Sequence, residues 1–404
     1  MGMSRRQPGT PGGASLSPWA EYVDLLKNAA ELETLAWDPT DEPLRAALYQ
    51  QFAMNIAQGY FLYFQADPAY PDWTPFENSV FVLQPNPDAV YYYTAVDGDG
   101  VYRVVGDRGT APVVGFATGK IIIGMGEPPG PGFNNYDVDN LDCSADGSFE
   151  VIFSTVRPAG YAGNWLYLHP ESRFILLRQF SYDWGRERDV RLAIERLDVT
   201  ALRQARDIAT VDRQLRELFG NYVRGLSRVA LGYIQSSRKR GLPHEMRLTD
   251  FLELGNGKEW PQAYFECTYD LQPDEVLVLE TELPQQHHYW NVQVIDALWN
   301  QVDLVHRQSS LNGLQARLDP DGKFRAVLSV KDPGIHNWLD PGGSLRGMLI
   351  GRWYRCSSHP TPKLTKVKFN ELNRYLPDAP RISPAERTEA LRTRRLGAQL
   401  RRRW

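Results

Sequence analysis

The stretch DGSFEVIFSTVRPAGYAGNWLYLHPESRFILLRQFSYDW, residues 146–184, decides the fold, because its pattern returns in DGKFRAVLSVKDPGIHNWLDPGGSLRGMLIGRWY, residues 321–354. Each copy holds Asp-Gly, Phe, Ser, Pro and Asn-Trp-Leu in the same order and at a nearly constant offset, followed by an arginine and further aromatics. Chance rarely supplies an ordered set of this kind. The repeat predicts two related domains, and its period is too long for a solenoid.

The sequence around both copies has the pattern of β structure. From about 71 to 197 and from about 260 to 355, short apolar runs such as AVYYYTAV alternate with clusters of Gly, Pro, Asn and Asp. Short strands separated by turn residues are typical of a sandwich or barrel. The chain is therefore predicted to be mainly β with helical additions, with two β domains joined by a helical segment.

Four other segments have helical spacing. Ser17-Pro18 and Ser383-Pro384 each place a capping serine before a first-turn proline, and a further helix is expected to begin near Thr40. Between 198 and 240 an apolar residue recurs every three or four positions, which predicts a structural connector with one buried stripe. The predicted organisation is a disordered tail over 1–15, N-terminal helices over 16–66, a first β-sandwich over 67–197, a helical connector over 198–258, a second β-sandwich over 259–360 and an extension with a basic helix over 361–404.

The basic C-terminal helix carries a run of arginines that can contact acidic lipid or RNA. We favour the plainer interpretation, a solvated face or a terminal tether, because the excess of positive charge is local. The arginines concerned are Arg387, Arg392, Arg394, Arg395 and Arg401 to Arg403.

Composition excludes several classes of protein. The 404 residues carry a formal net charge of −4 and a sequence pI of about 6.0, which argues against nucleic acid as a partner. No apolar run is long enough for a transmembrane segment, and none follows the N-terminal arginines as a secretory signal requires. Three widely separated cysteines without a CxxC pair indicate a reducing compartment, so a cytoplasmic location is expected.

The segment QPNPDAVYYY, residues 84–93, is the first candidate for chemistry. Strand alternation places Tyr91 and Tyr93 on one face, with Asn86 and Asp88 at the mouth of the strand. Two phenols and a carboxylate can orient a substrate and exchange protons. The alternative is an Asx-type turn that starts a strand whose tyrosines pack in the core.

Arginines inside apolar strands are the second candidate. Arg178, Phe180 and Tyr182 share one strand face, and Arg352 occupies the matching place in the second copy. An inward-facing arginine is costly unless it is paired. It forms a structural ion pair or it holds an anionic ligand, and Trp290 is a further candidate for substrate binding.

Histidines offer acid–base groups but no metal motif. His287 and His288 are adjacent, so on a strand they face opposite ways, and no HxH or HExxH occurs. His288 and His306 are candidates for acid–base catalysis because an ordinary histidine titrates near neutral pH. No metal site is predicted, although ligands from distant residues stay an alternative. No nucleotide-binding glycine motif is present, so no cofactor is predicted.

The chain resembles the bacterial family known as domain of unknown function 1214, which is related to domain of unknown function 1254. The matching features are PNPDAVYYY near 85–93, NWLYLHP with RQFSYDW in the first domain, and YWNVQVID with KDPGIHNWLDP and GRWYRC in the second. The resemblance implies jelly-roll-like sandwiches with helical additions. One departure is QVDLVHRQ at 301–308, where such proteins usually continue toward Asn-Arg-Tyr, so a site built there is expected to differ.

These patterns favour an enzyme over a pure binding module. Two aromatic-rich domains predict a cleft between them that takes a bulky apolar or aromatic small molecule. Without a cofactor, elimination or proton transfer by side chains is the expected chemistry. The alternatives are a non-catalytic module that binds carbohydrate, lipid or protein, and a histidine-ligated metal enzyme. The oligomeric state is left open. The expected acid–base residues are Asp88, Tyr91, Tyr93, His288 and His306, and the expected substrate-binding residues are Asn86, Arg178, Tyr182, Trp290 and Arg352.

Overall fold

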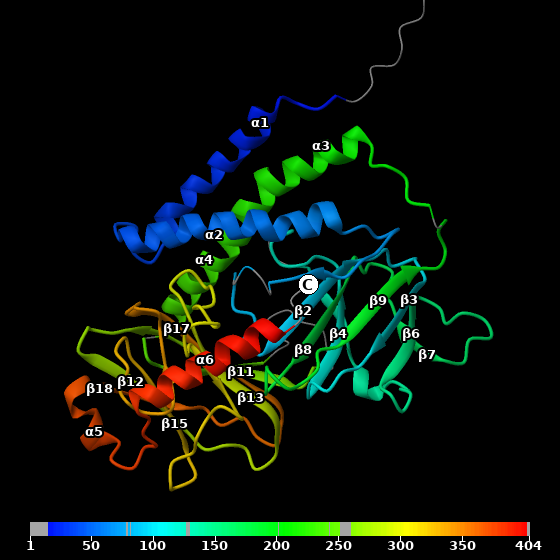
Figure 1. Ribbon diagram of the computed structural model, residues 1–404. Coiled ribbons are helices and arrows are strands. Elements are labelled where there is room, and N and C mark those ends of the chain that lie inside the picture. The colour runs from blue at the N-terminus through cyan, green and yellow to red at the C-terminus, as the bar shows by residue number, and fades with distance from the viewer. Residues whose placement is uncertain are drawn as a thin grey trace, which may run out of the picture.

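The computed structural model describes residues 15–77, 80, 82–126, 130–200, 202–241, 243–250 and 260–401. Within these ranges, eighteen strands form four sheets, and helices cover one side of them (Figure 1). Most of the predicted tail and Arg402 to Trp404 lie outside the described residues. The protein is mainly β, as predicted.

The first sandwich consists of a five-stranded sheet, in the order β1-β2-β8-β4-β5, and a four-stranded sheet, in the order β7-β6-β3-β9. Its interior holds apolar side chains from both sheets, such as Val104 from the four-stranded sheet and Leu177 from the five-stranded sheet. The strands are β1 (Thr74–Pro75), β2 (Ala89–Ala95), β3 (Tyr102–Asp107), β4 (Val113–Gly119), β5 (Gly132–Asp137), β6 (Ser148–Ser154), β7 (Asn164–Tyr167), β8 (Phe174–Phe180) and β9 (Arg191–Arg196).

The second sandwich repeats this topology strand for strand. Its sheets have the orders β10-β11-β17-β13-β14 and β16-β15-β12-β18, so each strand corresponds to the one nine places earlier. The predicted repeat is therefore confirmed at the level of strand order. The strands are β10 (Arg247–Asp250), β11 (Gln262–Asp270), β12 (Glu275–Thr281), β13 (His287–Ile295), β14 (Ser310–Asn312), β15 (Phe324–Leu328), β16 (Trp338–Leu339), β17 (Arg346–Cys356) and β18 (Lys363–Lys368).

The two Asn-Trp motifs have the same structural role. Each begins a short strand that runs parallel to its neighbour, β7 beside β6 and β16 beside β15. The Asn164 amide donates to the backbone oxygens of Asp142 and Glu150, and the Asn337 amide donates to those of Arg317 and Arg325. Trp338 is buried, whereas Trp165 is only half-buried.

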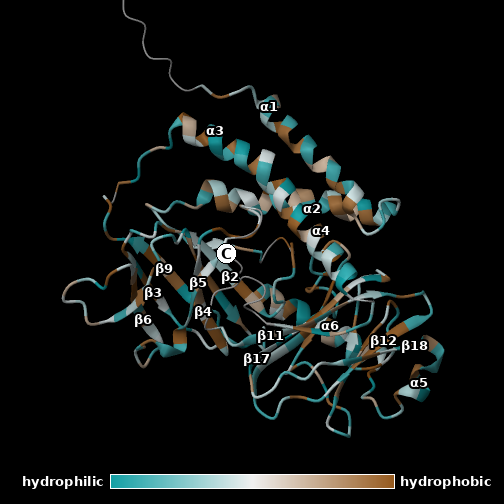
Figure 2. Cartoon of the chain, turned by 180° about the vertical axis from the view of Figure 1, so that it is seen from behind, coloured by the Kyte–Doolittle hydropathy of each residue, from teal (hydrophilic) through white to brown (hydrophobic). Residues whose placement is uncertain are grey.

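Helices from two parts of the chain form a layer against both sandwiches. Figure 2 shows this layer from behind, with polar and apolar residues alternating along its helices. The predicted connector is interrupted by one turn of π-helix and lies between the two domains in sequence. The elements are α1 (Trp19–Asp24), a 3₁₀ segment (Leu25–Leu35), α2 (Glu42–Tyr60), a π segment (Phe61–Gln65), α3 (Ile208–Arg216), a π segment (Glu217–Tyr222) and α4 (Val223–Arg240).

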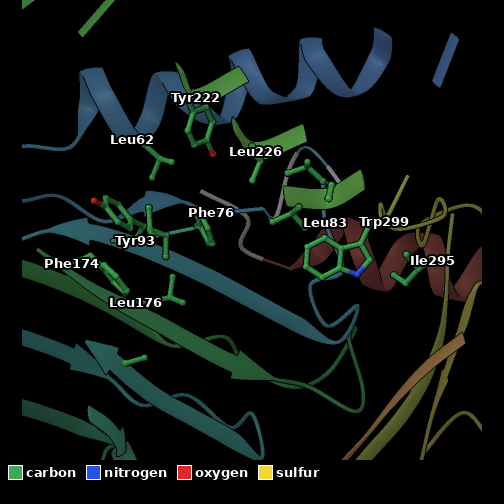
Figure 3. Close-up of a cluster of buried hydrophobic side chains, with 14 of the residues drawn as sticks. Leu62, Phe76, Leu83, Tyr93, Phe174, Leu176, Tyr222, Leu226, Ile295 and Trp299 are labelled. Atoms are coloured by element: carbon green, nitrogen blue, oxygen red, sulfur yellow. The ribbon is translucent and has the colours of Figure 1, made fainter. Parts of the chain in front are cut away.

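The largest apolar core lies between the domains rather than inside either sandwich. Outward-facing residues of both five-stranded sheets, such as Phe174 and Ile350, pack there with Tyr222 and Leu226 of the helical layer. Figure 3 shows the helices above these side chains and the strands below them. The two sandwiches are thus joined through a shared hydrophobic core, which favours one fixed arrangement of the domains.

The two helices expected at serine–proline pairs differ from each other. In α6 (Pro384–Leu400), Ser383 is the N-cap and forms a capping box with Glu386, as predicted. In α1, by contrast, Pro18 occupies the cap position, and the Ser17 side chain does not cap the helix. Trp19, the first residue of α1, is largely exposed.

For the basic C-terminal helix the sequence left open a solvated face or a terminal tether, and three of its arginines are not on a solvated face but act as a tether. Arg387, Arg394 and Arg401 recur every seven positions and are buried. Arg387 binds Asp332 at 2.9 Å, and Arg394 donates to the Ser310 hydroxyl at 2.6 Å. These bonds attach the helix to the second domain. The short helix α5 (Leu372–Tyr375) precedes α6, and no helix in the described ranges is long and apolar enough to cross a membrane.

Candidate functional site

A cavity of about 400 Å³ lies where the two five-stranded sheets meet the helical layer. Figure 3 shows four side chains of its wall, Phe76, Leu83, Phe174 and Leu176, between the helices and the strands. The volume is within the range of small-molecule sites. The apolar part of the lining consists of Phe76, Leu83, Ala117, Ile121, Ile122, Ile123, Phe174, Leu176, Val229 and Trp299.

Two buried arginines reach this cavity from equivalent positions of the repeat. Arg178 on β8 pairs across strands with Tyr91 on β2, and Arg352 on β17 pairs in the same way with Tyr264 on β11. All four residues line the cavity. Arg178 is 8% exposed and Arg352 is 3% exposed. The repeat therefore brings two guanidinium groups to one apolar space.

The surroundings of the arginines are aromatic. Cζ of Arg178 lies 4.8 Å from the centre of the Trp260 ring, and Cζ of Arg352 lies 5.3 Å from that of Tyr264. Nη2 of Arg352 donates to the backbone oxygen of Gln84 at 2.9 Å, whereas its buried Nη1 has no hydrogen-bond partner among the described residues. Burial lowers the pKa of Arg178. Aromatic faces offset part of the cost of burying positive charge but do not use the guanidinium donors.

Glu77 adds a carboxyl group to the same lining and is 9% exposed. Burial raises the pKa of Glu77 to about 8, and the charge of Arg352 opposes that shift. No hydrogen bond to its carboxyl oxygens is found within the described part of the chain. Its backbone N–H donates to Oε1 of Gln58 at 2.7 Å. At neutral pH the carboxyl is mostly protonated, so the cavity carries net positive charge.

Backbone strain is concentrated around the cavity. Among the described residues, five that are not glycine have a positive φ, and three of them, Glu77, Leu83 and Trp299, line the cavity. Their φ values are 60°, 65° and 68°. A side chain in this conformation costs on the order of 1–3 kcal/mol and persists where the surrounding structure fixes it. Such strain is typical of binding and catalytic sites.

Gln84 connects two parts of the wall. Its side-chain oxygen accepts a hydrogen bond from Nε1 of Trp299 at 2.6 Å, while its backbone oxygen binds Arg352. The Trp299 ring stacks on Tyr233 of α4, with 4.2 Å between ring centres. These contacts hold an aromatic side chain and a guanidinium in fixed positions on one side of the cavity.

The rest of this segment, residues 85–88, fastens the first domain to the second. The Tyr289 hydroxyl lies 2.6 Å from Oδ2 of Asp88 and 2.9 Å from Oδ1 of Asn86. Asn291 and Asn312 donate to Asn86 and Asp88 at 2.8 Å and 2.9 Å. Asn86 Oδ1 also accepts the backbone N–H of Asp88, which forms the Asx-type turn considered from the sequence. We call residues 84–88 the interdomain clasp.

The residues proposed from the sequence thus fall into separate groups. Tyr91, Arg178 and Arg352 line the cavity, whereas Asn86 and Asp88 belong to the clasp. Tyr182 accepts the backbone N–H of Trp290 beside the clasp. Tyr93 packs in the interdomain core, and Trp290 packs inside the second sandwich. His288 and His306 are exposed and outside the cavity lining, His306 beside Asp303.

The same two regions that carry the arginines identify the family. Residues 126–181 and 266–358 match the model of DUF1214, described as a protein of unknown function. The chain matches DUF1214 in both of its β domains. The resemblance to DUF1214 noted in the sequence is therefore confirmed for these two regions. Arg178 lies in the first DUF1214 region and Arg352 in the second, whereas Glu77 and Tyr91 lie before both.

A solved structure shows that the fold is shared with a bacterial protein. An uncharacterized protein from Burkholderia cenocepacia is 25% identical with a TM-score of 0.78, and the match covers 87% of this chain and 97% of that one. The VPA0106 protein from Vibrio parahaemolyticus is 12% identical with a TM-score of 0.44, covering 86% and 100%. The comparison with curated proteins found no match to this chain.

Three lining residues escaped sequence reasoning. Tyr264 stands at the same offset from Tyr91 as the rest of the repeat, so extending the repeat to the preceding strands identifies it. Glu77 and Trp299 have no comparable signal, because each lies in a loop without periodicity. Only long-range contacts, with Gln58 and with Gln84, bring them to the cavity wall.

The arrangement can bind an anion and can exchange a proton. Arg178 and Arg352 supply positive charge, and Glu77 supplies a group that titrates near neutral pH. Burial raises the pKa of Tyr91 to about 12, so its hydroxyl stays protonated. Within the described ranges, no three His, Cys, Asp or Glu side chains are grouped closely enough to hold a metal ion.

Proposed function

We propose that the protein binds, in the interdomain cavity, a small molecule with an apolar or aromatic body and an anionic group. The observation that carries this proposal is the convergence of Arg178 and Arg352 on one cavity whose remaining wall is largely apolar. Ligand pockets in general combine an apolar wall with a few polar groups that fix the orientation of the ligand.

An anion is favoured by the balance of charge. Two buried arginines share the cavity lining with a carboxyl group that is mostly neutral at pH 7. Nη1 of Arg352 keeps an unused donor within the described residues. A carboxylate is the group that a guanidinium binds most specifically, through two parallel hydrogen bonds. A ligand carboxylate would satisfy this donor and offset the buried charge.

The enzyme expected from the sequence is compatible with such a site, since bound ligand would lie beside Glu77. The aromatic walls favour binding of a small molecule over binding of a carbohydrate or a protein. Phe76, Phe174 and Trp299 line a cavity and not an open surface. The proposed partner is therefore a small molecule.

Binding of defined probes tests the proposal. We would measure affinity by calorimetry for phenylpyruvate, 4-methyl-2-oxopentanoate, phenylacetate and octanoate, with the matching amides of the last two as neutral controls. We expect the acids to bind and the amides to bind at least about tenfold more weakly, a difference of about 1.4 kcal/mol.

Variants locate the binding. Arg352→Met should weaken binding of the acids by at least about tenfold, whereas Arg186→Gln, which removes an exposed arginine, should not. His288→Ala and His306→Ala, both outside the cavity, should bind as the parent protein does. Equal affinity for acids and amides, or unchanged binding by Arg352→Met, would reject the anion site.

A further inference from the structure

We infer that Glu77 is the catalytic acid–base group of the cavity, and that it moves a proton between its carboxyl group and the carbon beside the carbonyl of a bound 2-oxo acid. The inference rests on the proposed function, because it requires the ligand to bind at Arg178 and Arg352. It goes further by naming the reacting group, the bond that changes and the class of substrate.

The position of Glu77 is the first argument. Its backbone has φ of 60°, and the 2.7 Å bond from its N–H to Gln58 helps to hold this conformation. The side chain therefore reaches the wall of the cavity, and it also borders a second, smaller cavity of about 40 Å³ beside Asn86 and Arg401. A strained backbone that directs a carboxyl group into a cavity does nothing for packing, which makes a chemical role the better explanation.

The surroundings of the carboxyl group are the second argument. Its oxygens receive no hydrogen bond from the described residues, so they are available to a ligand. The charge of Arg352 opposes the rise in the pKa of Glu77 that burial causes. Burial also raises the pKa of Tyr91, which the charge of Arg352 lowers and that of Glu77 raises. Because the pKa of Glu77 is raised to about 8, its two protonation states are both populated near neutral pH. An acid–base catalyst works best under that condition.

The pair of arginines determines the class of substrate. One guanidinium is needed for the carboxylate of the ligand. The second is then placed to stabilise negative charge that develops during the reaction. A 2-oxo acid has both features, since its carboxylate is permanent and its carbonyl oxygen becomes negative when the neighbouring carbon loses a proton.

The step balances without any further reactant. The C–H bond beside the carbonyl breaks, and its proton forms an O–H bond with the Glu77 carboxylate. The electron pair stays on the substrate as an enolate, whose oxygen faces a guanidinium. The reverse step returns a proton from Glu77 to the carbon. Nothing is oxidised or reduced.

Exchange with deuterium tests this step. The full-length protein would be incubated in D₂O with phenylpyruvate or 4-methyl-2-oxopentanoate, and loss of the hydrogen beside the carbonyl would be followed by NMR against a sample without protein. We expect faster exchange with the protein. Glu77→Gln should lose about 100-fold or more of this rate while its affinity for the probe stays within about threefold.

Two further variants complete the design. Glu187→Gln removes another carboxyl group with a raised pKa, about 7, that does not line the cavity, so it should leave exchange unchanged. Glu77→Asp should keep part of the rate, and the rate of the parent protein should change with an apparent pKa near 8. A probe that binds without faster exchange, or a Glu77→Gln variant that exchanges as fast as the parent, overturns the inference alone. Absence of binding by every probe overturns the proposed function as well.

Discussion

Arg178 and Arg352 occupy equivalent positions of the internal repeat, and both line one cavity. Each lies on the central strand of its five-stranded sheet, opposite a tyrosine of the neighbouring strand, Tyr91 in one case and Tyr264 in the other. Burial of two guanidinium groups carries a desolvation cost that packing alone does not require. This cost is the reason for proposing that the repeated arginines bind a ligand.

This relationship predicts how the arginines affect stability. We expect Arg352→Met to keep the free energy of unfolding within about 1 kcal/mol of the parent, because the lost bond to Gln84 is offset by removal of a buried charge. An arginine in a structural ion pair would instead cost about 3–5 kcal/mol when removed. Urea denaturation at pH 7 distinguishes the two. A loss in the larger range would show that Arg352 is chiefly structural.

The helical layer predicts a different kind of sensitivity. Leu218 is 3% exposed and packs in the interdomain core, so Leu218→Ala should lower the free energy of unfolding by on the order of 2–5 kcal/mol. Leu202 is 73% exposed, and Leu202→Ala should change it by less than about 0.5 kcal/mol. Chemical denaturation of both variants measures their free energies of unfolding. Equal losses would mean that the apolar stripe of the connector does not hold the helical layer in place.

Much of the fold was predictable because it depends on local pattern. The order of Asp-Gly, Asn-Trp and arginine in the two copies indicated the repeat, and Ser383-Pro384 marked the start of α6. The interruption of the connector at Glu217–Tyr222 was not predictable, since π-helical turns have no distinct spacing. The burial of the C-terminal arginines was also missed. Their charge alone does not indicate that Asp332 and Ser310, which are distant in sequence, accept their hydrogen bonds.

The sequence revealed a site residue only where a charged side chain interrupts an otherwise apolar strand. Arg178 drew attention as a cation inside an apolar strand, and it does line the cavity. His288 drew attention as a possible acid–base residue, yet it lies at the exposed start of β13, before that strand enters the core. Glu77 gave no signal, because its importance arises from φ of 60° and from contacts with residues far away in sequence. The domain boundaries stay predictions.

The interdomain clasp predicts that one hydroxyl helps to hold the domains together. Tyr289→Phe removes the group within 2.6 Å of Asp88 and 2.9 Å of Asn86, so it should cost about 1–3 kcal/mol of unfolding free energy. Tyr93→Phe is the matched control. Tyr93 is equally buried but packs against Phe76 and Phe174 in an apolar core. A loss in thermal stability that is no larger for Tyr289→Phe than for Tyr93→Phe would contradict the role of the clasp.

The raised pKa of Glu77 predicts how stability depends on pH. The ordinary pKa of 4.5 applies in the unfolded chain, while the folded value is about 8. Between these values the folded protein holds a proton that the unfolded chain has released. The contribution of Glu77 to stability is therefore complete below about pH 4.5 and is lost progressively as pH rises towards 8.

Glu77→Gln lacks this titration and should become more stable relative to the parent as pH rises from 5 to 8, by up to about 1.4 kcal/mol per pH unit. Parallel urea denaturation of both proteins at several pH values measures the difference. Glu187→Gln provides the comparison, since the pKa of Glu187 is raised to about 7 in a position away from the cavity. A stability difference between Glu77→Gln and the parent that does not change with pH would show that this carboxyl group titrates normally in the folded protein, and that burial does not prepare it to exchange a proton near neutral pH.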